Sequence, residues 1–223
     1  MATMKGVGVL VLAVMAFTAC GVGPAGPVAE HRHALTLALA DLPAGWSVDP
    51  EFTNLTTNPR DLVGDSSDVS PYTRNGWIAN YSAGFKAPVG APARKFYVLV
   101  NLFHDPGGAS GYWNGCNSDG CSGDHRQLDP GATSVPGAPH LGQDWFSTKV
   151  LSPYSCDKRP SAPGSSTAVI TCQSPAATAV EYTFNWRDRN VVVFLRLDAP
   201  VGTITDGEAS DIAQREQAVL ERQ

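Results

Sequence analysis

A pair of strands near the end of the chain constrains the fold more than any other stretch. Residues 180–187 alternate apolar and polar side chains, which is the period of a strand with one buried face. The apolar members are Val180, Tyr182, Phe184 and Trp186. A polar turn at 187–190 leads to a second run at 191–197, rich in β-branched and aromatic residues. The two runs predict a central antiparallel hairpin on which the rest of the chain is built.

Other segments extend this sheet. Further strands are predicted at 46–48, 77–85, 96–104, 143–151 and 167–173. The strand at 77–85 is predicted to turn Trp77, Ala79, Tyr81, Ala83 and Phe85 to one face, and the nearly continuous apolar run at 96–104 indicates a central strand. Residues 50–75 and 115–140 are rich in turn formers and are predicted to be long loops. Because loops as long as 50–75 are uncommon, a functional loop or a hidden short helix are the alternatives there.

Helices are predicted at 29–41, at 107–114 and from Thr205 onward. Thr205 and Glu208 have the spacing of a capping box, and Ile212 and Leu220 would then press on the sheet. With 22 Gly and 17 Pro, the chain favours short strands and turns over a helical bundle. The predicted class is α+β, with a twisted, mainly antiparallel sheet of about six or seven strands and terminal helices packed on it.

The first 20 residues predict export and a lipid anchor. Lys5 precedes an uncharged, largely apolar run at 6–17, which is too short to span a bilayer but suits an export signal. The run ends at residues 17–20 (FTAC), which resemble the lipobox of bacterial lipoproteins, where the cysteine is acylated. We therefore expect a signal peptide at 1–19, a tether at 20–29 that begins at lipidated Cys20, and a single domain at 30–223. The alternative is an ordinary signal peptide cleaved near Ala19.

Removal of Cys20 from the count leaves four cysteines. In an oxidising compartment Cys116, Cys121, Cys156 and Cys172 predict two disulfides, with three possible pairings. The local pairing, Cys116–Cys121 and Cys156–Cys172, closes the smallest loops and is preferred. A thiolate metal site is the alternative, but the four-residue spacing of the first pair is wider than zinc sites favour.

Motifs of catalysis are absent from the sequence. Neither G-x-S-x-G nor H-E-x-x-H occurs, and Ser110 lies in a glycine-rich turn. Three histidines at 104, 125 and 140 and the polar residues around 114–124 lack the spacing of a metal or calcium site. The net charge of −5 disfavours a nucleic-acid partner. We expect no enzymatic activity, no cofactor and no metal.

Aromatic residues are the remaining functional signal. Their number exceeds what one face of a small sheet must bury, so some could line a pocket for a lipid, a glycan or another small ligand. The candidate pocket residues are Trp77, Tyr81, Trp113 and Trp145. The alternative is that these side chains belong to the core.

Three short stretches stand out at 40–46 (ADLPAGW), 141–144 (LGQD) and 189–193 (RNVVV). Over roughly residues 30–222 the chain resembles exported actinobacterial lipoproteins and the sensor domains outside some membrane-bound serine/threonine kinases. The resemblance implies a twisted antiparallel sheet flanked by helices, often with two disulfides, and ligand binding or sensing without catalysis. Cys172 lies well upstream of Asn190, unlike the pattern expected of the kinase sensor domains, so no binding residue is carried over.

The sequence thus predicts a lipoprotein on the outer surface of the cell membrane with a ligand-binding or sensing domain. Its expected partners are the membrane, through the lipid anchor, and a small-molecule, lipid or glycan ligand. A protein–protein interaction module of the envelope is the alternative, and a cell-wall hydrolase is the third hypothesis.

Overall fold

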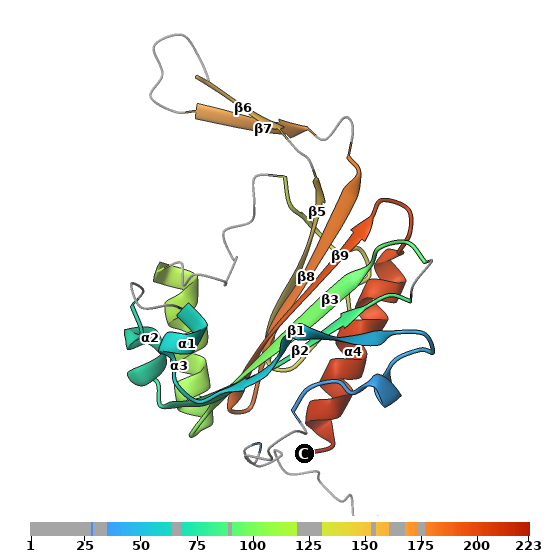
Figure 1. The fold of residues 1–223 in the computed structure, drawn as a ribbon. Helices are drawn as coiled ribbons and strands as arrows, with labels where there is room; N and C mark the ends of the chain where they lie inside the picture. Colours follow the sequence, from blue (N-terminus) through green and yellow to red (C-terminus); the bar gives the residue numbers. More distant parts are fainter. Residues whose placement is uncertain are drawn as a thin grey trace, which may run out of the picture.

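The structure, a computed structural model, describes residues 28, 35–63, 68–88, 91–119, 131–152, 155–160, 168–173 and 177–223. The strands of the main sheet are β1 Ser47–Thr56, β2 Trp77–Lys86, β3 Lys95–Phe103, β4 Thr133–Ser134, β5 Asp144–Ser152, β8 Ala179–Asp188 and β9 Val191–Pro200. They form a seven-stranded antiparallel sheet in the order β1-β2-β3-β9-β8-β5-β4 (Figure 1). The helices are α1 Arg60–Val63, α2 Ser70–Thr73, α3 Pro106–Asp119 and α4 Asp206–Glu221, with a 3-10 turn at Leu39–Asp41. The fold class is α+β, as predicted.

The predicted hairpin lies in the middle of this sheet. β8 and β9 pair from Ala179 opposite Pro200 to Asp188 opposite Val191, so Arg189 and Asn190 alone form the turn. Such tight turns require positive φ angles. Arg189 accordingly has a φ of 50°, the only positive value among the described residues other than glycine.

Each face of the sheet carries its own apolar cluster. α4 covers one face, where alternate residues of β3, β8 and β9, such as Val98, Phe184 and Leu195, meet Ala213 and Leu220. Figure 1 shows α1, α2 and α3 grouped on the other side of the sheet. There a smaller cluster contains Tyr72, Phe103, Ala109, Tyr112, Trp113 and Val192. β3 and β9 therefore bury apolar side chains on both faces, which confirms the central position predicted for the run at 96–104.

Glycines explain how α3 packs. Added Cβ atoms at Gly108 and Gly111 would lie 2.2 Å from the Asn75 carbonyl oxygen and 2.3 Å from its side-chain oxygen. No side chain could be placed that close, so the glycine-rich face of α3 rests on the turn between α2 and β2. Tyr112 and Trp113 of α3 are buried in the smaller cluster. The predicted helix at 107–114 is confirmed and extends further at both ends.

α4 begins as the capping box predicts. The Thr205 hydroxyl accepts a hydrogen bond from the Glu208 backbone N–H at 3.2 Å, and the Glu208 carboxylate accepts one from the Thr205 N–H at 2.8 Å. Ile212 and Leu220 are buried in the larger cluster, also as predicted.

Three predictions of elements were wrong. The helix expected at 29–41 is not formed over residues 35–41, where only a 3-10 turn occurs, because the chain there packs extended and bonds to α4 instead of to itself. The loop expected at 50–75 contains most of β1, together with α1 and α2. The strand expected at 167–173 exists as β7 Ala168–Gln173, but it pairs with β6 Ser155–Pro160 in a separate two-stranded sheet.

The prediction that Trp77 shares one face of β2 with the four alternate residues after it was also wrong. The register between β2 and β3 shifts between Trp77 and Ala79. A bulge of this kind reverses which face a residue points to. Trp77 therefore packs against the smaller cluster, whereas Ala79 and the alternate residues after it lie in the larger one.

Candidate functional site

An uncharged groove of about 590 Å³ lies beside the edge of the main sheet. Its floor is β2, one side is β1, and the other side is the segment 36–39 that precedes the 3-10 turn. The lining residues are Thr36, Leu37, Ala38, Leu39, Val48, Thr53, Asn54, Leu55, Tyr81, Ser82, Ala83 and Phe85. The volume lies within the range of small-molecule sites in proteins.

An irregular edge strand shapes one side of this groove. Asp49 pairs with Gly84 and Asn54 with Ser82, so residues 50–53 of β1 bulge out opposite a single residue of β2. The Thr53 hydroxyl replaces the missing ladder bonds, because it donates to the Asp49 carbonyl at 3.0 Å and accepts from the Gly84 N–H at 3.2 Å. Residues 53–55 then turn into the groove lining.

Phe52 holds the bulge in place from the other face of the sheet. Its ring stacks on Tyr97 with ring centres 5.5 Å apart. A Cβ atom added to Gly84 would lie 2.5 Å from the Phe52 Cβ, so only glycine at position 84 allows this approach.

The chemistry of the groove is apolar and neutral. Its lining contains no Asp, Glu, Lys, Arg or His. Six large hydrophobic side chains are exposed in the described part of the chain, and three of them, Leu39, Val48 and Leu55, line the groove. Apolar side chains gathered at a hollow indicate a binding surface more strongly than the same side chains scattered singly. Thr36, Thr53 and Asn54 add polar, uncharged side chains to the lining.

The segment that forms the third wall is attached to α4. The Leu37 backbone N–H donates to Glu216 Oε2 at 2.8 Å, inside the protein. Closer to the surface, Arg215 donates to the Asp41 carbonyl and Arg222 to the Asp41 carboxylate, each at 3.0 Å. Leu35 and Leu37 add buried apolar contacts.

Glu216 is the most perturbed acid of the described chain. The side chain is fully buried, and burial raises its pKa from 4.5 to about 8 because an ionised carboxylate loses its hydration there. The hydrogen bond from Leu37 acts in the opposite direction but is outweighed. Glu216 is therefore mostly protonated at neutral pH.

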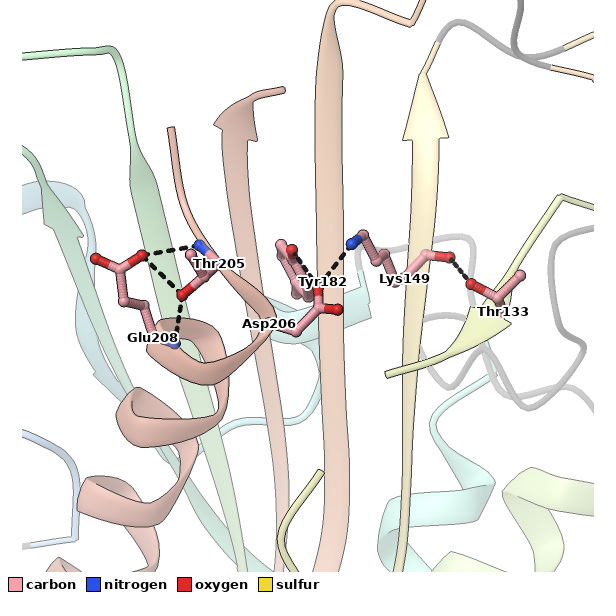
Figure 2. Close-up of polar contacts among 6 residues, drawn as sticks. All are labelled: Thr133, Lys149, Tyr182, Thr205, Asp206 and Glu208. Carbon is pink, nitrogen blue, oxygen red and sulfur yellow. Dashed lines mark hydrogen bonds and ion pairs between the residues drawn. The ribbon is translucent and has the colours of Figure 1, made fainter. Parts of the chain in front are cut away.

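A second polar cluster ties the start of α4 to the sheet. Figure 2 shows Lys149 of β5 and Tyr182 of β8 both directed at the Asp206 carboxylate, at 2.6 and 2.7 Å. The hydrogen bond to Asp206 raises the pKa of Lys149, burial raises that of Tyr182, and the bond from Lys149 lowers that of Asp206. Each group is thus held in its ordinary charge state at neutral pH. Such an arrangement suits an anchor and not an acid–base catalyst, which needs a pKa near 7.

Two other hollows are lined by charged groups. One, of about 550 Å³, lies where β2 ends and includes Lys86, Arg94 and Asp198. The other, of about 410 Å³, includes Asp188 and Arg189, which pair with each other at 3.2 Å. Neither hollow shows the cluster of exposed apolar side chains seen at the neutral groove.

The four aromatic residues proposed for a pocket lie in different surroundings. Tyr81 lines the neutral groove. Trp77 and Trp113 belong to the smaller apolar cluster under α3. Trp145 is partly buried against the larger cluster, with His140 edge-on at 5.8 Å. Sequence reasoning missed Leu55 because residues 50–75 were assigned to a loop. Val48 was assigned to a strand at 46–48, but nothing in that short stretch indicated a groove.

The cysteine predictions remain open. Cys20 and Cys121 lie outside the described residues, and Cys116 lies in α3. Cys156 of β6 and Cys172 of β7 are direct cross-strand partners. Opposite residues in antiparallel strands have Cα atoms about 4.5–5.5 Å apart, which is within the range that a disulfide spans. The register is therefore compatible with the preferred pairing.

Metal binding finds no support in the described residues, which contain no grouping of three or more His, Cys, Asp or Glu side chains suited to an ion. Of the residues whose spacing was considered for a metal site, His125 and Asp124 lie outside the described part of the chain. No helix of the described chain has the length and apolar character needed to cross a membrane.

Comparisons with known proteins give a likeness in structure but no family. No protein-family model matches the chain, and a search of curated proteins finds no match either. Among solved structures, the extracellular domain of PknH from Mycobacterium tuberculosis is similar with 16% identity and a TM-score of 0.43. The match covers 88% of this chain and 98% of that domain. The fold described above rests on the strands of this chain and not on that likeness.

Proposed function

We propose that this protein is an exported lipoprotein whose domain binds an uncharged, mainly apolar ligand, such as a molecule with an acyl chain, in the neutral groove. The observation that carries the proposal is the lining itself. Leu39, Val48 and Leu55 remain exposed around a hollow without a charged side chain. An apolar ligand would remove these side chains from water, at about 25 cal/mol for each Å² buried. A charged ligand would find no partner there.

The role is binding or sensing, without catalysis. The groove is lined by no carboxylate, imidazole, amine or thiol that could act as an acid, a base or a nucleophile, and its polar side chains are hydroxyl groups and the Asn54 amide. The ligand would be held at the outer face of the membrane by the lipid on Cys20. That anchor is supported by the lipobox-like sequence at 17–20.

Mass spectrometry tests the ligand first. The chain from Gly21 onward keeps every described residue, since these begin at Val28. Its mass in native and in denaturing spectra should differ by a retained ligand. Where no ligand survives purification, the uncharged fluorophore N-phenyl-1-naphthylamine serves as the probe and should bind with enhanced fluorescence.

A matched pair of variants locates the binding. Leu55→Asp places a charge in the groove, and Leu151→Asp makes the same change at a side chain of β5 that does not line it, with exposed fractions of 37% and 38%. We expect Leu55→Asp to weaken probe binding at least about tenfold, or ~1.4 kcal/mol, and Leu151→Asp to leave it unchanged. Equal affinities of the two variants would contradict the proposal.

The alternative of a protein–protein interaction module has one specific observation in its favour. β1 is an edge strand, and Val48, Phe52 and Leu55 are exposed along it. Edge strands with apolar side chains can pair with another chain. A stable complex that is lost in Leu55→Asp, without any bound small molecule, would favour this alternative.

The anchor has a separate test. Cys20→Ala should move the protein from the membrane fraction to the soluble fraction, whereas Gly23→Ala in the tether should not. Retention of Cys20→Ala in the membrane would exclude the lipid anchor.

A further inference from the structure

We propose that residues 35–42 form a gate over the neutral groove, and that Glu216 is the latch that holds this gate on α4. The inference rests on the proposed function, because it concerns access to the same groove. It adds a regulatory role for a residue that does not line the groove.

The gate is part of the groove wall but belongs to no sheet or α-helix. Thr36, Leu37, Ala38 and Leu39 line the groove. The same residues make no backbone ladder with β1 or β2, whose described partners are each other and β3. A wall without ladder bonds can move away while the seven-stranded sheet remains intact. Its position therefore depends on a few contacts with α4 and on the burial of Leu35 and Leu37.

The central contact is sensitive to charge. Glu216 Oε2 accepts the Leu37 N–H at 2.8 Å, while the other carboxylate oxygen, Oε1, is buried and has no hydrogen-bond partner among the described residues. Burial at this site costs a charged carboxylate far more free energy than a protonated carboxyl group, because one oxygen of the carboxylate would be buried without water or a hydrogen bond. Ionisation therefore favours an open arrangement in which water reaches Glu216.

The charged groups near Glu216 do not neutralise an ionised carboxylate there. Asp41 of the gate raises the pKa of Glu216, and Arg222, the residue after α4, lowers it. Arg222 is itself paired with the Asp41 carboxylate at 3.0 Å. Arg215 binds the Asp41 carbonyl and pairs with Asp211 on the surface. No cation contacts Glu216 directly among the described residues.

The direction of the pH response follows from the two states. In the closed state Glu216 has a pKa of about 8, and in the open, hydrated state it approaches the ordinary value of 4.5. At pH values between 4.5 and 8, Glu216 is therefore ionised in the open state but still protonated in the closed state. The opening equilibrium should therefore rise up to about tenfold for each pH unit between 4.5 and 8, and level off above 8.

Hydrogen exchange tests the gate without any ligand. In the chain from Gly21 onward, the protection of the Leu37 amide, corrected for intrinsic exchange, should fall between pH 5 and 7, by up to about 100-fold. Glu216→Gln keeps an acceptor for the Leu37 N–H but cannot ionise, so its protection should not change with pH. Glu221→Gln, the same change at an exposed position of α4, should behave like the wild type.

Probe binding connects the gate with the groove. The association rate of N-phenyl-1-naphthylamine should rise with pH in the wild type and in Glu221→Gln, and remain constant in Glu216→Gln. A similar pH dependence of Leu37 protection in Glu216→Gln and the wild type would overturn the latch. Loss of the pH response of Leu37 in Glu216→Gln, with no probe binding by any variant, would leave the latch intact and contradict the proposed function instead.

Discussion

At the scale of single residues, Asn190 joins three distant segments. Its side-chain amide donates to the Val28 and Phe103 carbonyls at 3.1 and 2.8 Å, and its oxygen accepts from the Val28 N–H at 2.6 Å. All three bonds are buried. Asn190 thus fixes the beginning of the domain to the turn between β8 and β9, and we call this set of three hydrogen bonds the clamp.

Asn190→Ala should therefore be strongly destabilising. Truncation leaves three buried backbone groups without partners, and we expect a loss of about 2–4 kcal/mol in the free energy of unfolding. Asn114→Ala is the control, because Asn114 is exposed on α3 and should change stability by less than about 0.5 kcal/mol. Urea denaturation measures both. A loss of under 1 kcal/mol for Asn190→Ala would show that the clamp contributes little.

Glu216 gives the global stability a pH dependence of known sign. Its pKa is about 8 in the folded chain and near 4.5 when unfolded, so from pH 4.5 to 8 the folded state binds the extra proton. The free energy of unfolding should then fall by about 1.4 kcal/mol per pH unit across this window. Asp206 acts in the opposite direction, since its pKa is lowered, but only when the pH falls towards and below 3.8.

The measurement is urea denaturation of the wild type and Glu216→Gln at pH 5, 6, 7 and 8. The difference in unfolding free energy between the two should grow in favour of Glu216→Gln as the pH rises. A constant difference over these pH values would mean that Glu216 is already ionised in the folded chain.

At the scale of elements, Gly84 decides the shape of the edge strand. Gly84→Ala would bring a Cβ atom to 2.5 Å from Phe52, so the bulge of β1 would have to move and Phe52 would leave Tyr97. Overpacking of this kind costs about 1–3 kcal/mol. Gly207→Ala is the matched control, because its added Cβ has only the Thr205 hydroxyl within 4 Å, at 3.9 Å, and should stabilise α4 by about 0.5–1 kcal/mol.

Thermal unfolding should shift in opposite directions for the two substitutions. The Gly84→Ala variant should also bind the groove probe more weakly, since residues 53–55 follow the bulge. Unchanged stability and unchanged probe affinity together would show that the bulge does not shape the groove.

The elements that could be predicted from the sequence are those whose pattern is local. β8 alternates strictly, β9 is a run rich in β-branched and aromatic residues, and α4 carries its own cap, so the hairpin and the helix were predicted close to their true bounds. β1 was mostly missed because an exposed, bulged edge strand has no apolar alternation and contains Pro50. The helix expected at 29–41 failed because tertiary bonds to α4 replace local ones.

The groove could not be predicted because it is built from three segments that only the fold brings together. One signal was nevertheless present in the sequence. Glu216 lies on the same helical face as Ile212 and Leu220, and an acid on a face that must be buried predicts either a partner or a raised pKa.

At the scale of the whole molecule, the two-stranded sheet and the seven-stranded sheet are separate units of hydrogen bonding. β6 and β7 pair only with each other among the described strands, and Figure 1 shows them beyond the main sheet. A Cys156–Cys172 disulfide would close a loop of about 15 residues, for which about 3 kcal/mol is expected. A lone hairpin of two strands is marginal in water without such a link.

The double variant Cys156→Ser with Cys172→Ser should therefore lose hydrogen-exchange protection in 155–173 while the main thermal transition stays nearly unchanged. Peptide mapping under non-reducing conditions would show the linked pair directly in the wild type. Free thiols at both positions in the exported protein would exclude the disulfide.

The clamp on Val28 also fixes which end of the domain lies near the membrane, if Cys20 carries the lipid. Seven residues lie between Cys20 and Val28, so the eight steps from one Cα atom to the next can reach at most about 29 Å. Val28 is bound to Asn190, and the adjacent Arg189 donates to the Leu220 carbonyl, so the end of α4 lies at the same end of the domain. A fluorophore after Gln223 should then transfer energy to a membrane dye more efficiently than one at Val201, which follows the other end of β9. Equal transfer efficiencies from the two positions would mean that the domain lies flat or tumbles on its tether. If the clamp sets the orientation, Asn190→Ala should bring the two transfer efficiencies closer together.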